Sequence, residues 1–302
     1  MPVNPGIEYG LAKEQYDKAR TTEEKIKALQ KMISSAPKHK GTENLLKQLK
    51  QKLSKLKQAS IKAAKKASYQ ISIKKEGAAQ IVLVGMTNTG KSLLLSKLTN
   101  AKPEIAEYLY TTKLPEQGIL DYNGIKLQLI EIPAITENFV YTSKGPFLFG
   151  LVKQSDLVLL ILDSLNYEEQ LNFLHNELEK GNVNNKFLYV VNRCDLNDIG
   201  NEKYLCVSAL TNLNLELLKQ RIWENLDVIA VYTKMPGKKK DFPPLALKKG
   251  SSVRDLAEHI HKDFVSKFRF ARIWGKSVKF DSQTVGLDHI LTNNDVVEFH
   301  TI

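Results

Sequence analysis

The stretch IVLVGMTNTGKSLLL, residues 81–95, joins an unbroken apolar run to a helical pattern through a glycine-rich turn. A continuous apolar run of this length is typical of a strand buried on both faces of a parallel sheet. Within the turn, Gly85, Gly90, Lys91 and Ser92 form the G-x-x-x-x-G-K-S pattern. Backbone N–H groups of such a turn wrap phosphate groups at the positive end of the following helix. The stretch therefore predicts a phosphate site on an α/β fold.

The rest of residues 79–227 repeats this alternation. Apolar runs such as IKLQLIEI, DLVLLILDS and KFLYVVN are separated by helical patterns such as EEQLNFLHNELEK and LNLELLKQRIWENL. Strands that alternate with helices are typical of a doubly wound, mostly parallel α/β sheet. We expect one nucleotide-binding domain over this range.

The two flanks have a different texture. In residues 1–78, Thr21 and Glu24 have capping-box spacing, and Leu46, Leu49 and Leu53 line one face of a second helix. The pattern predicts a lysine-rich helical hairpin. Residues 228–302 contain short strand patterns around one helix from about Val253 to Asp263, which indicates a compact α+β module.

Charge is distributed unevenly along the 302 residues. The net charge is +11 in residues 1–78, −5 in residues 79–227 and +5 in residues 228–302. Basic flanks around an acidic middle favour a polyanionic partner, although solvated basic helices are the alternative. Two cysteines without a pairing pattern, no apolar leader and no apolar run of about 20 residues predict a cytoplasmic protein that does not enter a membrane.

A later strand end offers a base-reading motif. In YVVNRCD, Asn192 and Asp195 follow a buried strand, at the edge of an open sheet where ligands bind. An aspartate there can accept both donors on the N1/N2 edge of guanine, and adenine lacks those donors. Asn192 would brace the loop, the stem of Arg193 can lie across the base, and the N–H of Ala209 in YLCVSAL can contact O6. We expect GTP and GDP as ligands.

The magnesium site is predicted from the same turn. The Ser92 hydroxyl would bind Mg²⁺, and Lys91 would reach the β- and γ-phosphates. Thr112, in EYLYTTKLPEQG, lies 21 residues beyond Lys91 in a segment suited to a mobile loop, and its hydroxyl would complete the Mg²⁺ shell. Thr111 is the rival candidate.

The whole set of predicted nucleotide contacts is Gly85, Asn88, Thr89, Gly90, Lys91, Ser92, Leu93, Ala134, Asn192, Arg193, Asp195, Ser208, Ala209 and Leu210. The residues predicted to act in hydrolysis are Lys91, Thr112, Asn88 and Glu131.

These motifs, the lysine-rich helical start and the tail from LALKKGSSVRDLAEHIHKDF to VGLDHIL resemble the DRG branch of the Obg-type GTPases. The tail resembles that branch's TGS domain, a small β-grasp module. The resemblance implies a translation-related GTPase that contacts ribosomes or RNA, often with a protein partner, here through the helices or the TGS domain. One departure is length: only 28 residues separate Asp163 from Asn192, where the branch usually carries an inserted domain.

A second departure is QLIEIPAITE, residues 128–137, where such GTPases carry Asp-x-x-Gly. Glu131 keeps the charge of the aspartate one methylene further out. Ala134 keeps the N–H that binds γ-phosphate but restricts the backbone freedom of glycine. Ile135 replaces the water-orienting Gln and resembles the branch's own hydrophobic substitution. We expect nucleotide binding with slow hydrolysis, and a non-hydrolysing adaptor is the alternative.

Asn88 has two interpretations. Its position resembles that of the P-loop asparagine in GTPases that bind K⁺ beside the phosphates, where a cation would stabilise developing charge. Alternatively, Asn88 merely tolerates the turn conformation.

The C-terminal flank holds candidates for RNA binding. Lys238, Lys239 and Lys240 lie in a loop beside Pro and Gly and are suited to phosphate contact. Nearby aromatic residues alternate with Lys and Arg, and we favour a role in the core of the small module over a base-stacking surface. These are Phe268, Phe270, Trp274 and Phe280. A third function class is a protein-interaction module that uses the N-terminal helices.

Overall fold

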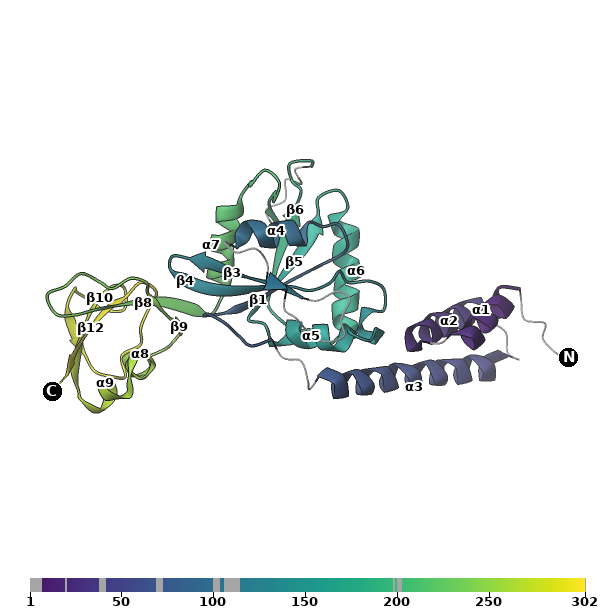
Figure 1. The fold of residues 1–302 in the computed structure, drawn as a ribbon, viewed down its shortest axis with the longest axis horizontal. Coiled ribbons are helices and arrows are strands. Elements are labelled where there is room, and N and C mark those ends of the chain that lie inside the picture. Colours follow the sequence, from purple (N-terminus) through teal and green to yellow (C-terminus); the bar gives the residue numbers. More distant parts are fainter. Residues whose placement is uncertain are drawn as a thin grey trace. The chain divides into compact units, whose positions relative to one another are not determined.

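Figure 1 shows the fold in a computed structural model, which describes residues 7–19, 21–37, 42–68, 73–99, 104–105, 115–197, 199 and 203–301. The chain forms two compact units that interleave along the sequence. The first is drawn from Met1–Ile73, Ile135–Gln154 and Asn172–Asn184, and the second from Lys74–Ala134, Ser155–Leu171 and Asn185–Ile302. The sequence-based boundaries at residues 78 and 227 stay a prediction.

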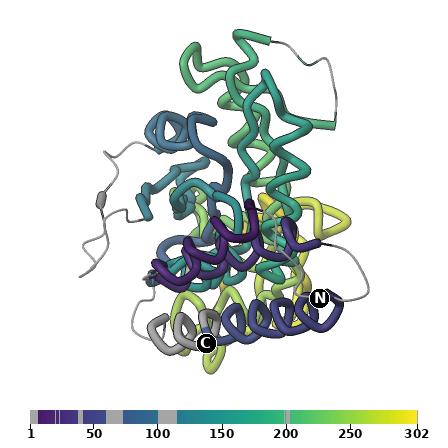
Figure 2. Tube along the Cα trace, turned by 90° about the vertical axis from the view of Figure 1, so that its right-hand side faces the viewer, coloured from purple at the N-terminus to yellow at the C-terminus, as the bar shows by residue number. Residues whose placement is uncertain are grey.

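The first unit is helical. It contains α1 (Ile7–Lys18), α2 (Thr22–Ser35), α3 (Glu43–Ser68), the 3-10 turn η2 (Phe139–Tyr141) and α5 (Gly145–Gln154). α2 contacts both α1 and α3, and Figure 2 shows these three helices side by side. The N-terminal region thus holds three helices where the sequence predicted a hairpin of two.

Local sequence explains the boundaries of α2 and its packing. The Thr21 side chain accepts a hydrogen bond from the Glu24 N–H, and the Glu24 carboxylate accepts one from the Thr21 N–H, which confirms the predicted capping box. Leu29, Met32 and Leu49 are buried, while Leu53 packs against the same cluster. α3 also packs against α5 and η2. The segment that follows Ala134 is therefore part of the same packed unit as the N-terminal helices.

The second unit contains a seven-stranded sheet in the order β2-β3-β4-β1-β5-β6-β7. The strands are β1 (Gln80–Gly85), β2 (Glu104–Ile105), β3 (Glu116–Tyr122), β4 (Ile125–Glu131), β5 (Leu157–Asp163), β6 (Phe187–Asn192) and β7 (Leu205–Cys206). The β2–β3 and β3–β4 pairs are antiparallel and the others are parallel. The predicted doubly wound, mostly parallel sheet is confirmed.

The sheet's central strands are apolar throughout because both of their faces are buried. Every residue of β1 and β5 is buried. On one face, Ile81 and Leu83 share a core with α4 (Lys91–Leu98) and α7 (Leu215–Asn225). α6 (Tyr167–Lys180) is the helix between β5 and β6. This rigid sheet places the ends of β1, β4, β5 and β6 at one edge.

A second sheet follows, with five strands in the order β11-β10-β12-β8-β9. Its elements are β8 (Val228–Lys234), β9 (Leu245–Lys248), α8 (Val253–Ile260), α9 (Lys262–Ser266), β10 (Phe268–Trp274), β11 (Gln283–Val285) and β12 (Val296–Thr301). Ser252 and Asp255 form a capping box at the start of α8. The single predicted helix is two, because the backbone is extended at His261, which caps α9.

Among the described helices, none combines the length and apolar character needed to cross a bilayer.

Candidate functional site

The phosphate turn lies between β1 and α4, as the sequence predicts. Gly90 begins α4 with φ of 80°, a left-handed conformation that favours glycine. A Cβ at Gly90 would also lie 2.3 Å from Asn192 Nδ2, and a Cβ at Gly85 would lie 2.5 Å from the Ile161 carbonyl oxygen. Both glycines are therefore required by close approach of the turn to neighbouring strands. Asn88 has φ of 61° and thus occupies the turn conformation that its side chain tolerates.

Lys91 points its ammonium group into this turn. The side chain is buried, and Nζ donates to the Met86 carbonyl oxygen at 2.5 Å and to Thr89 Oγ1 at 3.5 Å. Burial lowers the pKa of Lys91, and nearby Glu131 opposes that shift. The Met86 carbonyl oxygen carries partial negative charge and accepts a hydrogen bond from the buried Lys91 ammonium group. A phosphate oxygen would make the same kind of contact.

Glu131 and Ser92 meet beside Lys91. Ser92 Oγ donates to Glu131 Oε1 at 2.9 Å, and the buried Glu131 Oε2 has no hydrogen-bond partner in the described part of the chain. Burial raises the pKa of Glu131; the Ser92 hydrogen bond and Lys91 lower it, and Glu116 raises it. Glu116 is the direct cross-strand partner of Glu131 in the β3–β4 ladder. Like charges opposite one another disfavour ionisation unless a cation lies nearby.

This oxygen-rich cluster fits Mg²⁺, which prefers hydroxyl and carboxylate oxygens. Ser92 and Glu131 would hold the ion, and the buried, unpartnered Oε2 is the atom that such a cation would satisfy. When bound, Mg²⁺ supplies positive charge to the β- and γ-phosphate oxygens. Thr112 and its rival Thr111, the other predicted ligands, lie outside the described residues.

The base-reading side is held together by Asn192. Its Nδ2 donates to the Thr89 carbonyl oxygen at 2.9 Å, and its Oδ1 accepts from the Ala209 N–H at 3.0 Å. One buried amide thus joins the phosphate turn to the loop after β7. The Ala209 N–H, predicted to contact guanine, is donated to Asn192 in this structure.

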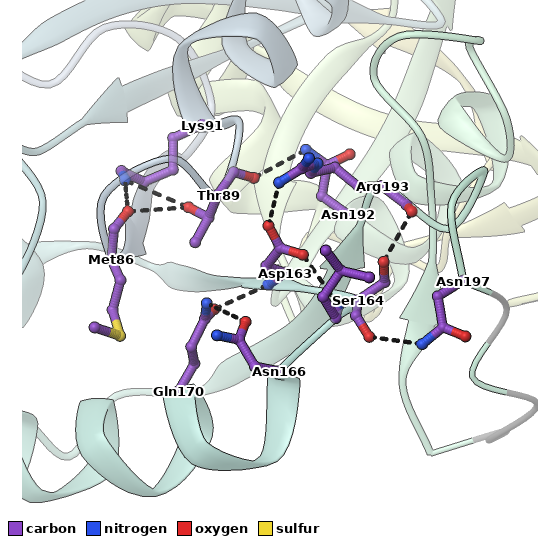
Figure 3. A network of polar contacts seen from close by, with 11 residues as sticks. Met86, Thr89, Lys91, Asp163, Ser164, Asn166, Gln170, Asn192, Arg193 and Asn197 are labelled. Carbon is purple, nitrogen blue, oxygen red and sulfur yellow. Dashed lines mark hydrogen bonds and ion pairs between the residues drawn. The ribbon is translucent and has the colours of Figure 1, made fainter.

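Arg193 and Asp195 have contrasting surroundings, as Figure 3 shows for Arg193. Arg193 Nη1 lies 2.6 Å from Asp163 Oδ2 at the end of β5. Asp195 is exposed, and its carboxylate accepts no hydrogen bond from the described residues. The Asp195 carboxylate is therefore available to a ligand, whereas the Arg193 guanidinium already has a partner.

Sequence reasoning missed Asp163 and Ser164 as part of this site. Ser164 Oγ donates to the Arg193 carbonyl oxygen at 2.8 Å. The available signal was the polar pair that ends the apolar run DLVLLILDS, because strand ends at this edge carry site residues.

The other predicted nucleotide contacts range from fully buried to exposed. Thr89 and Ser208 are fully buried, Ala134 is half-buried, and Leu93 and Leu210 are 41% and 71% exposed. Their contact with a nucleotide stays a prediction. Lys238, Lys239 and Lys240 are exposed between β8 and β9, in the second sheet's domain rather than at the phosphate turn.

Two protein families match the chain. Residues 80–193 match the family described as 50S ribosome-binding GTPase, and residues 229–301 match the TGS domain. An uncharacterized GTP-binding protein of Methanocaldococcus jannaschii is 32% identical over 359 aligned positions, which cover 91% of this chain and 92% of that protein. The human developmentally-regulated GTP-binding protein 2 is 27% identical, over 91% of this chain and 98% of its own length.

The chain is a member of the developmentally-regulated GTP-binding protein (DRG) family. It is a GTP-binding protein with a P-loop GTPase domain and a C-terminal TGS domain, as the sequence predicted. Among solved structures, a GTP-binding protein of Pyrococcus horikoshii OT3 is similar over 74% of this chain and all of that one, with 16% identity and a TM-score of 0.49.

This DRG protein is shorter than its relatives. The alignment with the archaeal relative spans 359 positions, whereas 91% of 302 residues is about 275, so roughly 84 positions of the relative have no counterpart here. Only α6 and its linkers lie between β5 and β6. The segment between β5 and β6 thus holds one helix and no further domain, in agreement with the 28-residue spacing of Asp163 and Asn192.

Proposed function

We propose that this DRG protein is a GTP-operated switch that hydrolyses GTP slowly and acts in association with ribosomes or other RNA. The observation that carries the proposal is the convergence of two groups at one sheet edge. The Lys91–Ser92–Glu131 cluster lies at the ends of β1 and β4, and the Asp195 loop follows β6. In open α/β sheets, ligands bind at the carboxyl ends of the strands.

Slow hydrolysis follows from the residues beside the γ-phosphate position. The longer Glu131 side chain reaches Ser92 directly, so the serine hydroxyl must exchange this partner before it serves a metal ion. Ala134 restricts the hinge that follows, and the buried Ile135 offers no group to orient an attacking water. The phosphate turn and base-reading loop, which supply most of the binding, are unaffected.

The face of the TGS sheet opposite α8 supports RNA association. Ala271 and Ile273 of β10 are buried in the core with α8, so the alternating Phe270 and Trp274 lie on the opposite face. The sequence-based preference for a core position therefore holds for Phe268, which packs against the core, but not for these two rings. Phe270 and Trp274 are half-buried, and Phe280 is 64% exposed.

Cations accompany the rings on that face. Lys234 Nζ lies 3.8 Å from the Trp274 ring centroid, Lys240 Nζ lies 3.8 Å from that of Tyr232, and Arg272 lies 5.7 Å from that of Phe270. Aromatic rings for bases beside cations for phosphates suit single-stranded RNA. The match to the family described as 50S ribosome-binding GTPase favours ribosomal RNA as that partner.

The decisive test of the enzymatic proposal is multiple-turnover GTP hydrolysis with and without ribosomes in K⁺ buffer. We expect low intrinsic turnover that rises on addition of ribosomes. Turnover that stays at the buffer background in both conditions would favour a second function, a GTP-gated adaptor, which the Glu131–Ser92 bond and Ala134 also support.

The RNA proposal is tested by anisotropy titration of a labelled single-stranded RNA at several salt concentrations. Replacing Lys238, Lys239 and Lys240 with Ala should lower the slope of log affinity against log salt by about 2. Phe270→Ala should weaken binding about tenfold through lost stacking. The matched control replaces three other exposed lysines of the same domain, Lys249, Lys262 and Lys267, which lie outside the loop between β8 and β9. An equal loss in the control would contradict a specific interface.

A further inference from the structure

The backbone of Arg193 is in a conformation that requires support. Its φ of 67° is in the left-handed region, which is uncommon for a residue with a long side chain. Ser164 Oγ donates to the Arg193 carbonyl oxygen at 2.8 Å, and the Leu196 N–H donates to the same oxygen at 2.9 Å. The contact from the end of β5 therefore helps to hold a strained residue at the start of the base-reading loop.

The Asp163 side chain holds the other end of Arg193, its guanidinium group. The 2.6 Å contact joins a side chain that is 9% exposed, that of Asp163, to one that is 41% exposed, that of Arg193. Asp163 is itself fixed, because its Oδ1 accepts from the Leu165 N–H at 3.0 Å and its own N–H donates to Gln170 Oε1 at 2.9 Å. Figure 3 shows the chain of contacts from Gln170 through Asp163 to Arg193.

The far end of the loop is also tied to β5. Asn197 Nδ2 donates to the Ser164 carbonyl oxygen at 2.9 Å. Residues 193–197 are thus anchored at both ends to two consecutive residues of one buried strand end. Asp195 lies between these anchors with an exposed carboxylate. Its position is therefore set by Asp163 and Ser164 before a ligand arrives.

We propose that Asp163 is a positioning residue for guanine specificity, which acts through Arg193 to aim the Asp195 carboxylate. The inference rests on the proposed GTP-binding function and deepens it, since it assigns specificity to a residue outside the phosphate and base-reading motifs. Asp163 itself has no need to touch the base. Its negative charge holds Arg193 and the loop that follows it in place. In this conformation the Asp195 carboxylate can accept hydrogen bonds from both the N1–H and the 2-amino group of guanine.

If Asp163 had only a structural role, its removal would change the stability of the protein and would leave the preference for guanine unchanged. An ion pair with a partly exposed arginine contributes little to global stability, because water solvates the guanidinium when the carboxylate is removed. Loss of loop geometry instead acts on the hydrogen bond to the guanine 2-amino group, which requires accurate placement. The ratio of affinities for GDP and inosine diphosphate isolates that bond, because hypoxanthine lacks the 2-amino group and keeps N1–H.

The experiment measures this ratio by competition titration against a fluorescent GDP analogue. The wild type should prefer GDP by about 10- to 100-fold, the worth of one hydrogen bond to a charged acceptor. Asp163→Asn keeps the side-chain shape and should lower the preference about tenfold, with GDP still bound. The matched control is Glu298→Gln, which removes a similarly buried carboxylate paired with Lys234 in the TGS domain and should leave the ratio unchanged.

Two further variants keep the proposal testable. Ser164→Ala removes the hydroxyl that donates to the Arg193 carbonyl oxygen and should lower the ratio in the same direction, even if Asp163→Asn does not fold. Because Asp163 acts through Arg193, the double variant Asp163→Asn with Arg193→Ala should be no less selective than Arg193→Ala alone.

The outcomes separate the two levels of inference. A wild type that binds both nucleotides equally well would overturn the guanine-reading function and this inference with it. A wild type that prefers GDP, beside Asp163→Asn and Ser164→Ala variants that keep the full ratio, would overturn only the positioning role.

Discussion

The two sides of the nucleotide site are built differently. On the base side, the buried Asn192 amide has partners in two loops, and Asp163 and Ser164 hold the loop that carries Asp195. On the phosphate side, Lys91 Nζ donates a hydrogen bond to the Met86 carbonyl oxygen, and Glu131 Oε2 is buried without a hydrogen-bond partner among the described residues.

The difference shows on which side of the site the protein alone supplies hydrogen-bond partners for the buried polar groups. Buried polar groups that already have partners need no ligand to stabilise their geometry, whereas a buried unpartnered oxygen next to a cation favours whatever satisfies it. The proposed base-reading loop therefore has its internal hydrogen bonds without a ligand, whereas the proposed phosphate side holds a buried oxygen that a bound ligand or cation would satisfy. Substitutions on the two sides should separate affinity, specificity and turnover.

The largest effect is expected from Lys91→Ala. Removing a buried cation that would contact the β- and γ-phosphates should weaken GDP and GTP binding by about 100-fold or more. The preference for GDP over inosine diphosphate should stay, because the base side is intact. Fluorescent nucleotide titration measures both quantities, and exposed Lys97 of the same helix gives the control Lys97→Ala. Unchanged affinity in Lys91→Ala would refute the phosphate role.

Asp195→Asn should act on the base side alone. Loss of the charged acceptor should weaken GDP binding about 30-fold, and the new amide donor should improve binding of xanthosine diphosphate, whose base has an oxygen at position 2. Competition titration with both nucleotides measures the exchange of preference. If both ligands weaken equally, Asp195 does not read the base.

Glu131→Asp combined with Ala134→Gly should raise turnover while leaving binding nearly unchanged. The shorter carboxylate withdraws from Ser92, and glycine restores backbone freedom after it. We expect a gain in single-turnover GTP hydrolysis of about tenfold, equivalent to a barrier lowered by about 1.4 kcal/mol, with GDP affinity as the internal control. A fall in rate would mean that the natural pair is already the more active one.

The smallest effect concerns Asn88 and potassium. If its amide helps to hold K⁺, turnover in KCl should exceed that in NaCl a few-fold, about 1 kcal/mol of barrier. Because Asn88 has φ of 61°, Asn88→Ala also strains the turn, whereas Asn88→Gly removes the amide without strain. Loss of the K⁺ effect in both variants supports ion binding. Retention of the effect in Asn88→Gly would limit Asn88 to its role in the turn.

Much of this architecture could be predicted from the sequence because it depends on local patterns. Both capping boxes, the buried strands and the phosphate turn follow from residues within a few positions of one another. α1 was missed because its apolar residues do not all line one face: Tyr9 and Ala12 are buried, whereas Ile7 and Leu11 are exposed. The break between α8 and α9 depends on the extended backbone of His261. The sequence pattern does not distinguish this residue from a helical one.

The aromatic residues of the TGS sheet illustrate another limit. Alternation along β10 divides the residues into two sets, but it cannot say which set the helix covers. Packing of α8 against Ala271 and Ile273 decides the matter and leaves Phe270 and Trp274 on the face opposite α8.

By itself, the sequence determined the kind of ligand and the kind of sheet, since glycine spacing and apolar runs are local constraints on the backbone. Only the tertiary structure decided the partners of the charged groups: Asp163 meets Arg193 across 30 positions, and Glu131 meets Ser92 across 39. The reason is that parallel strands bring distant segments to one edge. Which side chains then pair depends on how deeply each is buried and on the direction in which it points. Neither can be derived from the sequence alone.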